Sequence, residues 1–416
     1  MPDILSSFLY LKVILKINFR YLNIPMKRIY FLLFQLILLH YSVFSQQNFS
    51  LENGDRLVLL GNALIENEQQ FGFLEYKLSN FYPEKHLTFR NLGWSGDTVF
   101  GEARSYYTNP PGPYDLLISQ IKAAEPNWVI IGYGNVEAQK GAAGLDLFKN
   151  GMNQLLDSVE AIGAHAILLS TIPQISAGTK DLLALRNKAY RDYNQAIQAI
   201  AQSRKLAFVD VFDAFTTTTA AEFYENNGIH LNEKGYAQLA ETIMNQLGLS
   251  RETPTIEIDA ATKSVESNVP VNKLSIPDKT RNISFQSTQN PPSYPHQANE
   301  TIKVKGLKKG TYALSMDGKL VAVGNRKAWE AGIPLAQSPG LQQTEQMLKL
   351  IREKDKIYFQ QYRPQNRTYI LGFRSYEQGR HKEGLAALDA LILWLDDQIN
   401  QTKKPINLHY QLERLP

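Results

Sequence analysis

The chain has 416 residues, of which 44% are apolar and 20% charged, a composition typical of a folded protein with room for two domains. Five of its 44 basic residues and one of its 40 acidic residues lie in residues 1–45, so the rest is neutral and lacks the basic surface of proteins that bind nucleic acid or anionic membranes. The absence of cysteine excludes disulfides, thiolate metal sites and lipid attachment to cysteine.

Residues 1–45 have the pattern of a secretory signal. Met26-Lys27-Arg28 is a short basic start, the apolar run 29–39 follows, and Val43-Phe44-Ser45 ends in a small residue. The run is shorter than the roughly 20 residues that span a bilayer, so we expect no stable membrane anchor after cleavage. We therefore predict an exported protein, periplasmic or extracellular, whose translation starts at Met26. The alternative is a two-segment N-terminal anchor that includes residues 1–25.

Residues 50–250 alternate between strand-like and helix-like segments. Short apolar runs predict strands at 56–61, 87–91, 126–132, 164–170 and 207–211. Apolar residues at helical spacing predict helices at 67–81, 116–124, 145–162, 180–204 and 233–247. This order predicts an α/β domain with a doubly wound parallel sheet. Its functional site should lie at the carboxyl ends of the strands, near Gly61, Asn91, Gly132 and Val211.

Beyond residue 250 the composition and the hydrophobic pattern of the chain change. Residues 251–300 are rich in Ser, Thr, Asn and Pro, and we predict a linker with short extended segments. Residues 301–322 alternate apolar and polar side chains around Gly turns, which indicates β-hairpins. Helices are expected from 339 to about 360 and over 382–401, with an aromatic, basic stretch at 358–376. Residues 301–416 thus form a smaller β-hairpin and helical region.

Four short motifs stand at the predicted strand ends or just before the last helix. They are Gly61-Asn62-Ala63-Leu64, the stretch 91–98 (NLGWSGDT), Gly134-Asn135-Val136-Glu137 and Asn227-Gly228-Ile229-His230. In order and spacing they resemble the sequence blocks of SGNH hydrolases, the GDSL-type lipases and esterases, over residues 56–249. The resemblance implies a flavodoxin-like three-layer domain and ester hydrolysis, with a carbohydrate or lipid ester as the substrate.

The resemblance also assigns roles, and this chain departs from several of them. The family's serine nucleophile is replaced by Ala63, whose methyl group cannot attack a carbonyl carbon. Gly96 matches the glycine whose N–H helps to form the oxyanion hole. The oxyanion asparagine of the third block is replaced by Val136. Asn135 is one residue away and should point to the opposite side of an extended strand end. A local bulge would turn it back and make Asn135, with Gly96, a candidate for the oxyanion hole.

The last block keeps its histidine and loses its acid. His230 matches the family's general base, whereas Asn227 stands where an aspartate orients that base. An amide cannot stabilise an imidazolium by charge, and in Ser-His-Asp enzymes this Asp-to-Asn change costs about 10⁴-fold in rate. Glu225 is close in the sequence and could take the place of the missing acid. From these substitutions we expect the standard serine mechanism to be absent.

Two functions from different classes remain open. The first is a hydrolase with rearranged chemistry, in which Ser95 is the nucleophile, or His230 activates water, with Glu66, Asp97 or Glu137 as the carboxylate. The plainer alternative is that Ser95 and Asp97 brace their loop through hydrogen bonds.

The second function is a non-catalytic pseudo-hydrolase that binds a glycan or another small-molecule ester. Rings available for stacking are those of Trp94 and Tyr133 and of the stretch 358–376, namely Tyr358, Phe359, Tyr362, Tyr369, Phe373 and Tyr376. The turn at 363–366 suggests that this stretch forms a loop near the cleft, although aromatic side chains of this kind more often belong to a core. A role of residues 301–322 in assembly is a further alternative. The seven histidines are scattered, so we expect no metal and no cofactor.

Overall fold

The structure is a computed structural model that describes residues 49–104, 112–176, 178–217, 219–277, 282–289, 301–335, 338–363 and 382–416. The predicted leader, residues 1–45, lies outside these ranges, as does most of the aromatic stretch 358–376. Both therefore remain predictions made from sequence.

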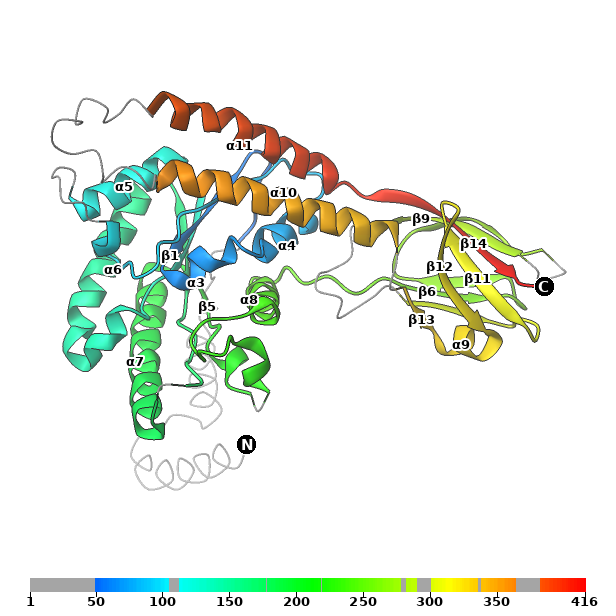
Figure 1. Ribbon diagram of the computed structural model, residues 1–416, viewed down its shortest axis with the longest axis horizontal. Coiled ribbons are helices and arrows are strands. Elements are labelled where there is room, and N and C mark those ends of the chain that lie inside the picture. The colour runs from blue at the N-terminus through cyan, green and yellow to red at the C-terminus, as the bar shows by residue number, and fades with distance from the viewer. Residues whose placement is uncertain are drawn as a thin grey trace, which may run out of the picture. The chain divides into compact units, whose positions relative to one another are not determined.

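A five-stranded sheet forms the centre of the first domain (Figure 1). Its strands are β1 (Arg56–Gly61), β2 (Thr88–Asn91), β3 (Trp128–Gly132), β4 (His165–Leu169) and β5 (Ala207–Val209). Their order is β2-β1-β3-β4-β5, and every neighbouring pair is parallel. This is the flavodoxin-like order, in which ligands bind at the switch point between β1 and β3. The predicted α/β class is thereby confirmed.

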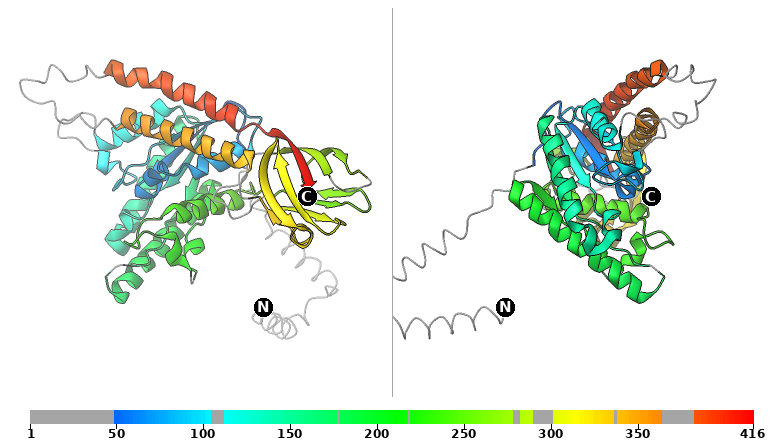
Figure 2. Two further views of the ribbon diagram at one scale, coloured as in Figure 1. Left: turned by 45° about the vertical axis from the view of Figure 1, so that its right-hand side comes forward. Right: turned by 90° about the vertical axis from the view of Figure 1, so that its left-hand side faces the viewer.

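Helices cover both faces of the sheet, which makes three layers (Figure 2). They are α3 (Ala63–Glu68), α4 (Phe73–Phe81), α5 (Pro113–Ala124), α6 (Leu145–Ala161), α7 (Lys180–Arg204) and α8 (Glu233–Gln246). Side chains of β1 alternate between the two cores: Leu57 and Leu59 join the core that includes α4 and α8, whereas Val58 and Leu60 join the core of α5, α6 and α7. The helix predicted at 67–81 is divided into α3 and α4, because the chain turns at Gly72, whose φ is 70°.

The second domain consists of two β-sheets around one apolar core. One sheet has the order β13-β10-β6-β7 and the other the order β12-β11-β14-β9-β8. The strands are β6 (Thr255–Asp259), β7 (Ser264–Ser267), β8 (Val271–Ser275), β9 (Asn282–Gln289), β10 (Thr301–Lys305), β11 (Thr311–Met316), β12 (Lys319–Asn325), β13 (Ile333–Pro334) and β14 (Ile406–Arg414). A short helix, α9 (Arg326–Ala331), follows β12.

Two predictions for this region need correction. The segment expected to be a linker, 251–300, contains the strands β6 to β9, which supply core residues such as Ile256 and Phe285. The strands β11 and β12 form the expected hairpin, but β10 pairs in parallel with β6 rather than with its sequence neighbour β11. Tertiary pairing thus decides the structure of segments whose composition is that of a loop.

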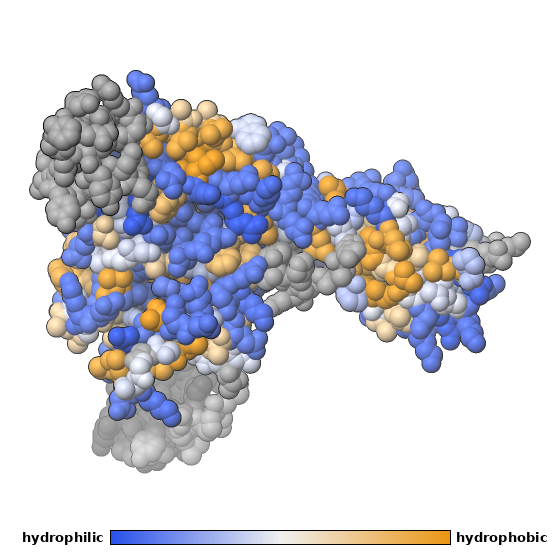
Figure 3. Space-filling model, in the orientation of Figure 1, coloured by the Kyte–Doolittle hydropathy of each residue, from blue (hydrophilic) through white to orange (hydrophobic). Residues whose placement is uncertain are grey.

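Two long helices, α10 (Pro339–Tyr362) and α11 (Lys382–Thr402), pack against each other, and α10 contacts α4 and β2 of the first domain (Figure 1). A buried ionic cluster joins them: Lys354 Nζ lies 2.5 Å from Glu75 of α4, and Arg90 of β2 pairs with Asp396 of α11 at 2.8 Å. The outer surface of α11 is apolar (Figure 3), with Trp394 55% exposed.

Candidate functional site

A pocket of about 240 Å³ lies at the carboxyl ends of the central strands, where a flavodoxin-like sheet binds its ligands. Its lining comes from the loops after β1, β2, β3 and β4, from the segment before α8 and from residues of α3, α7 and α8. The lining residues are Asn62, Ala63, Leu64, Gly96, Asn135, Val136, Gln139, Ile172, Pro173, Gln174, Tyr190, Ile229, His230, Leu231 and Tyr236. The pocket thus brings together residues from all four sequence motifs.

Ala63 enters the pocket at the start of α3. Asn62 caps this helix, since its Oδ1 accepts a hydrogen bond from the Leu64 backbone at 3.3 Å. The Asn62 Nδ2 atom is buried and has no hydrogen-bond partner among the described residues. Ala63 is only partly buried, so its methyl group forms part of the pocket wall. The residue predicted at the nucleophile position therefore lies in the same pocket as His230.

Gly96 is the pocket residue of the loop after β2. Its φ is 79°, a left-handed conformation that favours glycine, and a Cβ there would meet no atom within 4 Å. The loop is fixed by backbone bonds: Gly93 N donates to Asn91 Oδ1 at 2.8 Å and Trp94 N donates to Gly61 O at 2.9 Å. The Gly96 backbone is therefore presented to the pocket on a firmly held loop.

Ser95 is exposed and is not one of the residues that line the pocket. Its backbone N–H donates to the Glu66 carboxylate. No hydrogen bond joins the Ser95 hydroxyl to His230 in the described part of the chain, so the structure does not bring together the pair that a Ser95 nucleophile requires.

Asp97 and Glu66, two of the candidate carboxylates, are engaged in holding this loop. Asp97 is fully buried and accepts hydrogen bonds from Arg104 Nε at 2.7 Å and from the Tyr133 hydroxyl at 2.8 Å. Glu66 accepts a bond from Arg363 at 3.1 Å in addition to the Ser95 N–H. Neither carboxylate lines the pocket, which is the result expected if these residues brace the loop.

Glu137 connects the loops after β2 and β3. Its two carboxylate oxygens accept hydrogen bonds from Val99 N at 3.0 Å and from Gly134 N at 2.9 Å. Burial raises the pKa of Glu137 from 4.5 to about 7, against the opposing effect of these backbone bonds. Its position is structural, because it ties one loop of the pocket to the other.

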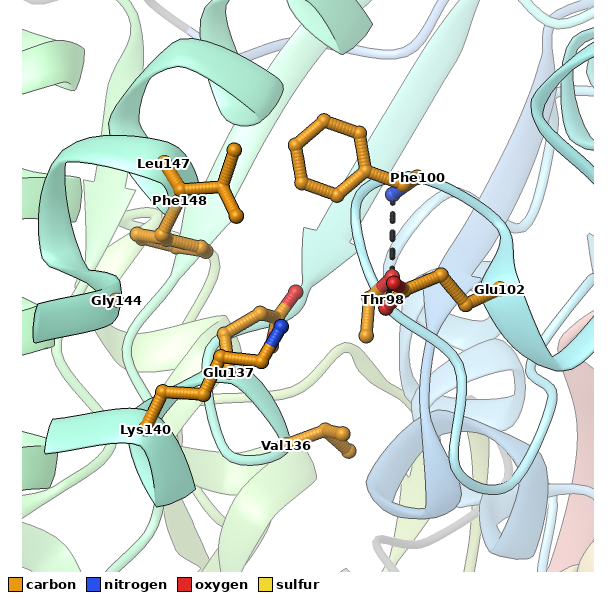
Figure 4. A pocket seen from close by; sticks show the side chains of 9 residues that line it. All are labelled: Thr98, Phe100, Glu102, Val136, Glu137, Lys140, Gly144, Leu147 and Phe148. Atoms are coloured by element: carbon orange, nitrogen blue, oxygen red, sulfur yellow. Dashed lines mark hydrogen bonds between the residues drawn. The ribbon is translucent and has the colours of Figure 1, made fainter.

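Glu137 also lines a second, smaller cavity of about 60 Å³, which Figure 4 shows. In that view Phe100 faces Leu147 and Phe148 across the cavity, and Val136 and Lys140 lie below Glu137. Val136 lines both this cavity and the main pocket. The residue at the predicted oxyanion-asparagine position therefore contributes an apolar side chain between the two.

Asn135 and Val136 both line the main pocket. Strict alternation along an extended strand end would point Asn135 away, whereas a local bulge would keep it a candidate for the oxyanion hole, and its place in the lining agrees with the second alternative. The reason is local: Gly134, with φ at 121°, takes the chain out of the extended conformation immediately before Asn135. Asn135 Nδ2 donates a long hydrogen bond of 3.4 Å to Ile172 O. An amide donor is therefore present in the pocket, one residue before the expected position.

His230 is oriented by Asn227. Asn227 Oδ1 accepts two backbone hydrogen bonds, from Ile229 N at 2.8 Å and from His230 N at 2.9 Å. These bonds fix the amide so that its Nδ2 faces His230 Nδ1 at 3.3 Å and Glu225 Oε2 at 3.2 Å. An amide nitrogen only donates, so Nδ1 must accept, and the neutral ring carries its proton on Nε2. His230 thus offers the pocket a hydrogen-bond donor rather than a base.

The end of α10 also reaches the pocket loops, near the turn at 363–366 that the sequence suggested would pack close to the cleft. Tyr362 and Arg363 contact Gly93, Trp94 and Glu66 across nearly 300 positions of sequence. The aromatic, basic stretch 358–376 and its turn indicated a loop near the cleft, but the sequence did not indicate which residues it contacts. In the ranges that the structure describes, no group of His, Asp or Glu side chains could hold a metal ion. No described helix is long and apolar enough to cross a membrane.

The comparison with known families agrees with this geometry. Residues 64–238 match the model of the GDSL-like lipase/acylhydrolase family. The α/β domain belongs to this family. The match begins one residue after Ala63 and includes Gly96, Asn227 and His230.

One solved structure shares the fold over most of the chain. A gut microbial diltiazem-metabolizing enzyme is 15% identical, with a TM-score of 0.68, and the alignment covers 89% of this chain and 100% of that chain. The shared fold therefore extends beyond the GDSL-like domain. An acetylxylan esterase from Geobacillus stearothermophilus is 19% identical (TM-score 0.39; 49% of this chain, 100% of that chain). A lipase/acylhydrolase from Enterococcus faecalis is 16% identical (TM-score 0.38; 46% and 95%). No curated protein matches the sequence.

Proposed function

We propose that the GDSL-like domain belongs to an exported protein and binds a small-molecule or glycan ester in the main pocket without acyl-serine chemistry. The observation that carries this proposal is the hydrogen bond between Asn227 Nδ2 and His230 Nδ1 at 3.3 Å. It gives the imidazole the tautomer opposite to the one that a general base at Nε2 requires.

The pocket also lacks a nucleophile. Ala63 ends in a methyl group, and Ser95, the serine considered as an alternative nucleophile, lies outside the lining. Acyl-enzyme formation needs a hydroxyl within hydrogen-bond reach of a base, usually about 2.6–3.2 Å. With both the nucleophile and the base absent, the first chemical step of a serine hydrolase has no starting point here.

The remaining groups suit an acceptor-rich ligand such as an ester. His230 offers an Nε2–H, Asn135 lies in the pocket with its amide, and the Gly96 backbone is exposed. A carbonyl oxygen is an acceptor without a donor, so it complements groups of this kind. Ile172 and Ile229 add apolar surface, which would suit an acyl group. A carbohydrate ester and a lipid ester both satisfy these requirements.

A second candidate is hydrolysis by water, and one distance favours it. Glu225 Oε2 lies 3.9 Å from His230 Nδ1. If this carboxylate displaced the Asn227 amide, Nδ1 would donate to it and Nε2 would be free to take a proton from water. The two half-exposed side chains have room to rotate, with 52% of Glu225 and 45% of His230 accessible.

The test combines hydrolysis and binding. Purified protein is assayed on p-nitrophenyl acetate and acetylated oligosaccharides, and binding of the same oligosaccharides is measured by calorimetry. His230→Ala is compared with His409→Ala, which removes an exposed histidine of β14 in the other domain. We expect background hydrolysis in all three proteins, and weaker binding in His230→Ala alone. Turnover that disappears with His230→Ala would instead establish the water-based hydrolase.

A further inference from the structure

The last turn of α10 contacts the loop that carries Gly96. The Tyr362 hydroxyl donates a hydrogen bond of 2.6 Å to Gly93 O and accepts one of 3.2 Å from Gln69 Nε2. Its backbone carbonyl accepts a bond from Gln120 Nε2 at 2.7 Å, which fixes the end of the helix on the first domain. Tyr362 is itself buried, so its ring is held firmly behind the loop.

Arg363, the next residue, forms a second contact with the same loop. Its guanidinium lies over the Trp94 ring, 4.3 Å from the centroid, and donates to Glu66 at 3.1 Å. The Glu66 carboxylate in turn accepts the Ser95 N–H. A continuous series of contacts therefore runs from Arg363 through Glu66 to the residue beside Gly96.

The loop has little freedom to adjust on its other side. A Cβ on Gly93 would lie 2.2 Å from the Glu66 backbone nitrogen, so the loop is already packed directly on α3. A displacement of Tyr362 or Arg363 would therefore also displace the backbone of Gly96, because the packed loop has no space in which to deform.

The helix that supplies these residues is anchored by charge. Lys354 is fully buried, and its Nζ lies 2.5 Å from Glu75 and 3.7 Å from Asp396. Burying ions is costly unless they remain paired, so the cluster favours the one position of α10 that keeps these ions paired. Rigid supports of this kind are what a precise binding loop requires.

We infer that Tyr362 and Arg363 are positioning residues for the pocket, so that the C-terminal helices complete a site whose lining comes from the GDSL-like domain. Both residues lie outside residues 64–238, which match the family. The inference does not depend on the proposed function, because a loop must be positioned equally for binding and for hydrolysis.

The test compares two hydroxyl deletions on the same helix. Tyr362→Phe removes the bond to Gly93, whereas Tyr358→Phe removes the hydroxyl of another largely buried tyrosine of the same helix that makes no hydrogen bond to Gly93. Amide hydrogen exchange of the full chain is followed by mass spectrometry in peptides covering 92–98. We expect exchange there to be roughly five- to tenfold faster in Tyr362→Phe and unchanged in Tyr358→Phe. Exchange in α6 serves as the reference and should not change.

A second pair of variants, at Arg363, tests whether faster exchange comes from a lost contact or from misfolding of one variant. Arg363→Met should also speed exchange at 92–98, and Arg363→Lys, which keeps a cation near Glu66, should restore most of the protection. Wild-type exchange in both Tyr362→Phe and Arg363→Met would overturn the inference. So would an equal increase in α6, because that result would show a general loss of stability rather than local positioning.

Discussion

Asn227 donates its side-chain amide to Nδ1 of His230 across 3.3 Å, while its carbonyl oxygen is held by two backbone N–H groups. An aspartate at this position would accept from Nδ1–H instead and leave Nε2 unprotonated. The substitution therefore reverses the roles of the two ring nitrogens, and does more than remove a charge. It also matches the other change in the pocket, since Ala63 offers no hydroxyl for Nε2 to deprotonate.

Restoring the family's serine and aspartate, one after the other, should restore esterase activity in two steps. Ala63→Ser alone supplies a hydroxyl but leaves the wrong tautomer, so we expect esterase activity barely above background. Adding Asn227→Asp should raise that activity by up to about 10⁴-fold. Initial rates on p-nitrophenyl acetate measure both steps. A single Ala63→Ser variant as active as the double variant would show that Asn227 does not limit the site.

Gly93→Ala should destabilise the protein by about 3 kcal/mol, because the new Cβ would lie 2.2 Å from backbone atoms of α3 that cannot move aside. Gly96→Ala is the matched control: its Cβ meets no atom, so the cost is limited to the left-handed φ, about 1 kcal/mol. Urea unfolding of both variants gives the two values. Equal losses would mean that close packing of the loop on α3 is unimportant.

Glu137 should make stability depend on pH. Burial raises its pKa from 4.5 to about 7, so the folded state holds a proton that the unfolded state releases within this interval. This contribution is complete below pH 4.5 and is lost as pH rises through 7, a difference of about 3 kcal/mol. Glu137→Gln cannot titrate.

The unfolding free energy of wild type relative to Glu137→Gln should therefore fall between pH 5 and 8. Glu125→Gln, at a side chain that is 81% exposed, is the control and should follow wild type. Parallel pH curves for wild type and Glu137→Gln would contradict the assignment.

Lys354→Met should cost about 3–5 kcal/mol, since it leaves Glu75 buried without the cation that lies 2.5 Å away. Lys349→Met, on the same helix, removes a lysine that is 72% exposed and lies 4.0 Å from Glu353, so we expect a change below 1 kcal/mol. Chemical denaturation measures both variants. A small loss in Lys354→Met would show that α10 is held by apolar packing rather than by the ionic cluster.

The sequence predicted secondary structure best for strands that are buried on both faces of a sheet. Strands such as β1 and β3 are buried along their length, and such apolar runs between helical segments predict a parallel sheet. The strands β7 and β8 are largely exposed, so they carry no apolar alternation, and their polar composition predicted a linker. Their structure depends on pairing with β6 and β9, which a local pattern does not record.

The same distinction applies to the pocket. Local motifs predicted that Ala63, Gly96 and His230 would meet, because they follow strands whose ends share one edge of the sheet. They did not predict the positions of Ser95 or Asp97, which depend on hydrogen bonds to Glu66 and Arg104. The contact of Tyr362 with Gly93 joins residues far apart in the chain, and no spacing rule reports such a contact.

The most direct test is the protonation of the His230 ring, measured by nitrogen-15 NMR of the imidazole at a pH where the ring is neutral. The account predicts a protonated Nε2 and a hydrogen-bonded, unprotonated Nδ1, with the reverse assignment in Asn227→Asp. A neutral wild-type ring that carries its proton on Nδ1 would contradict it, and would identify His230 as a base available to the pocket.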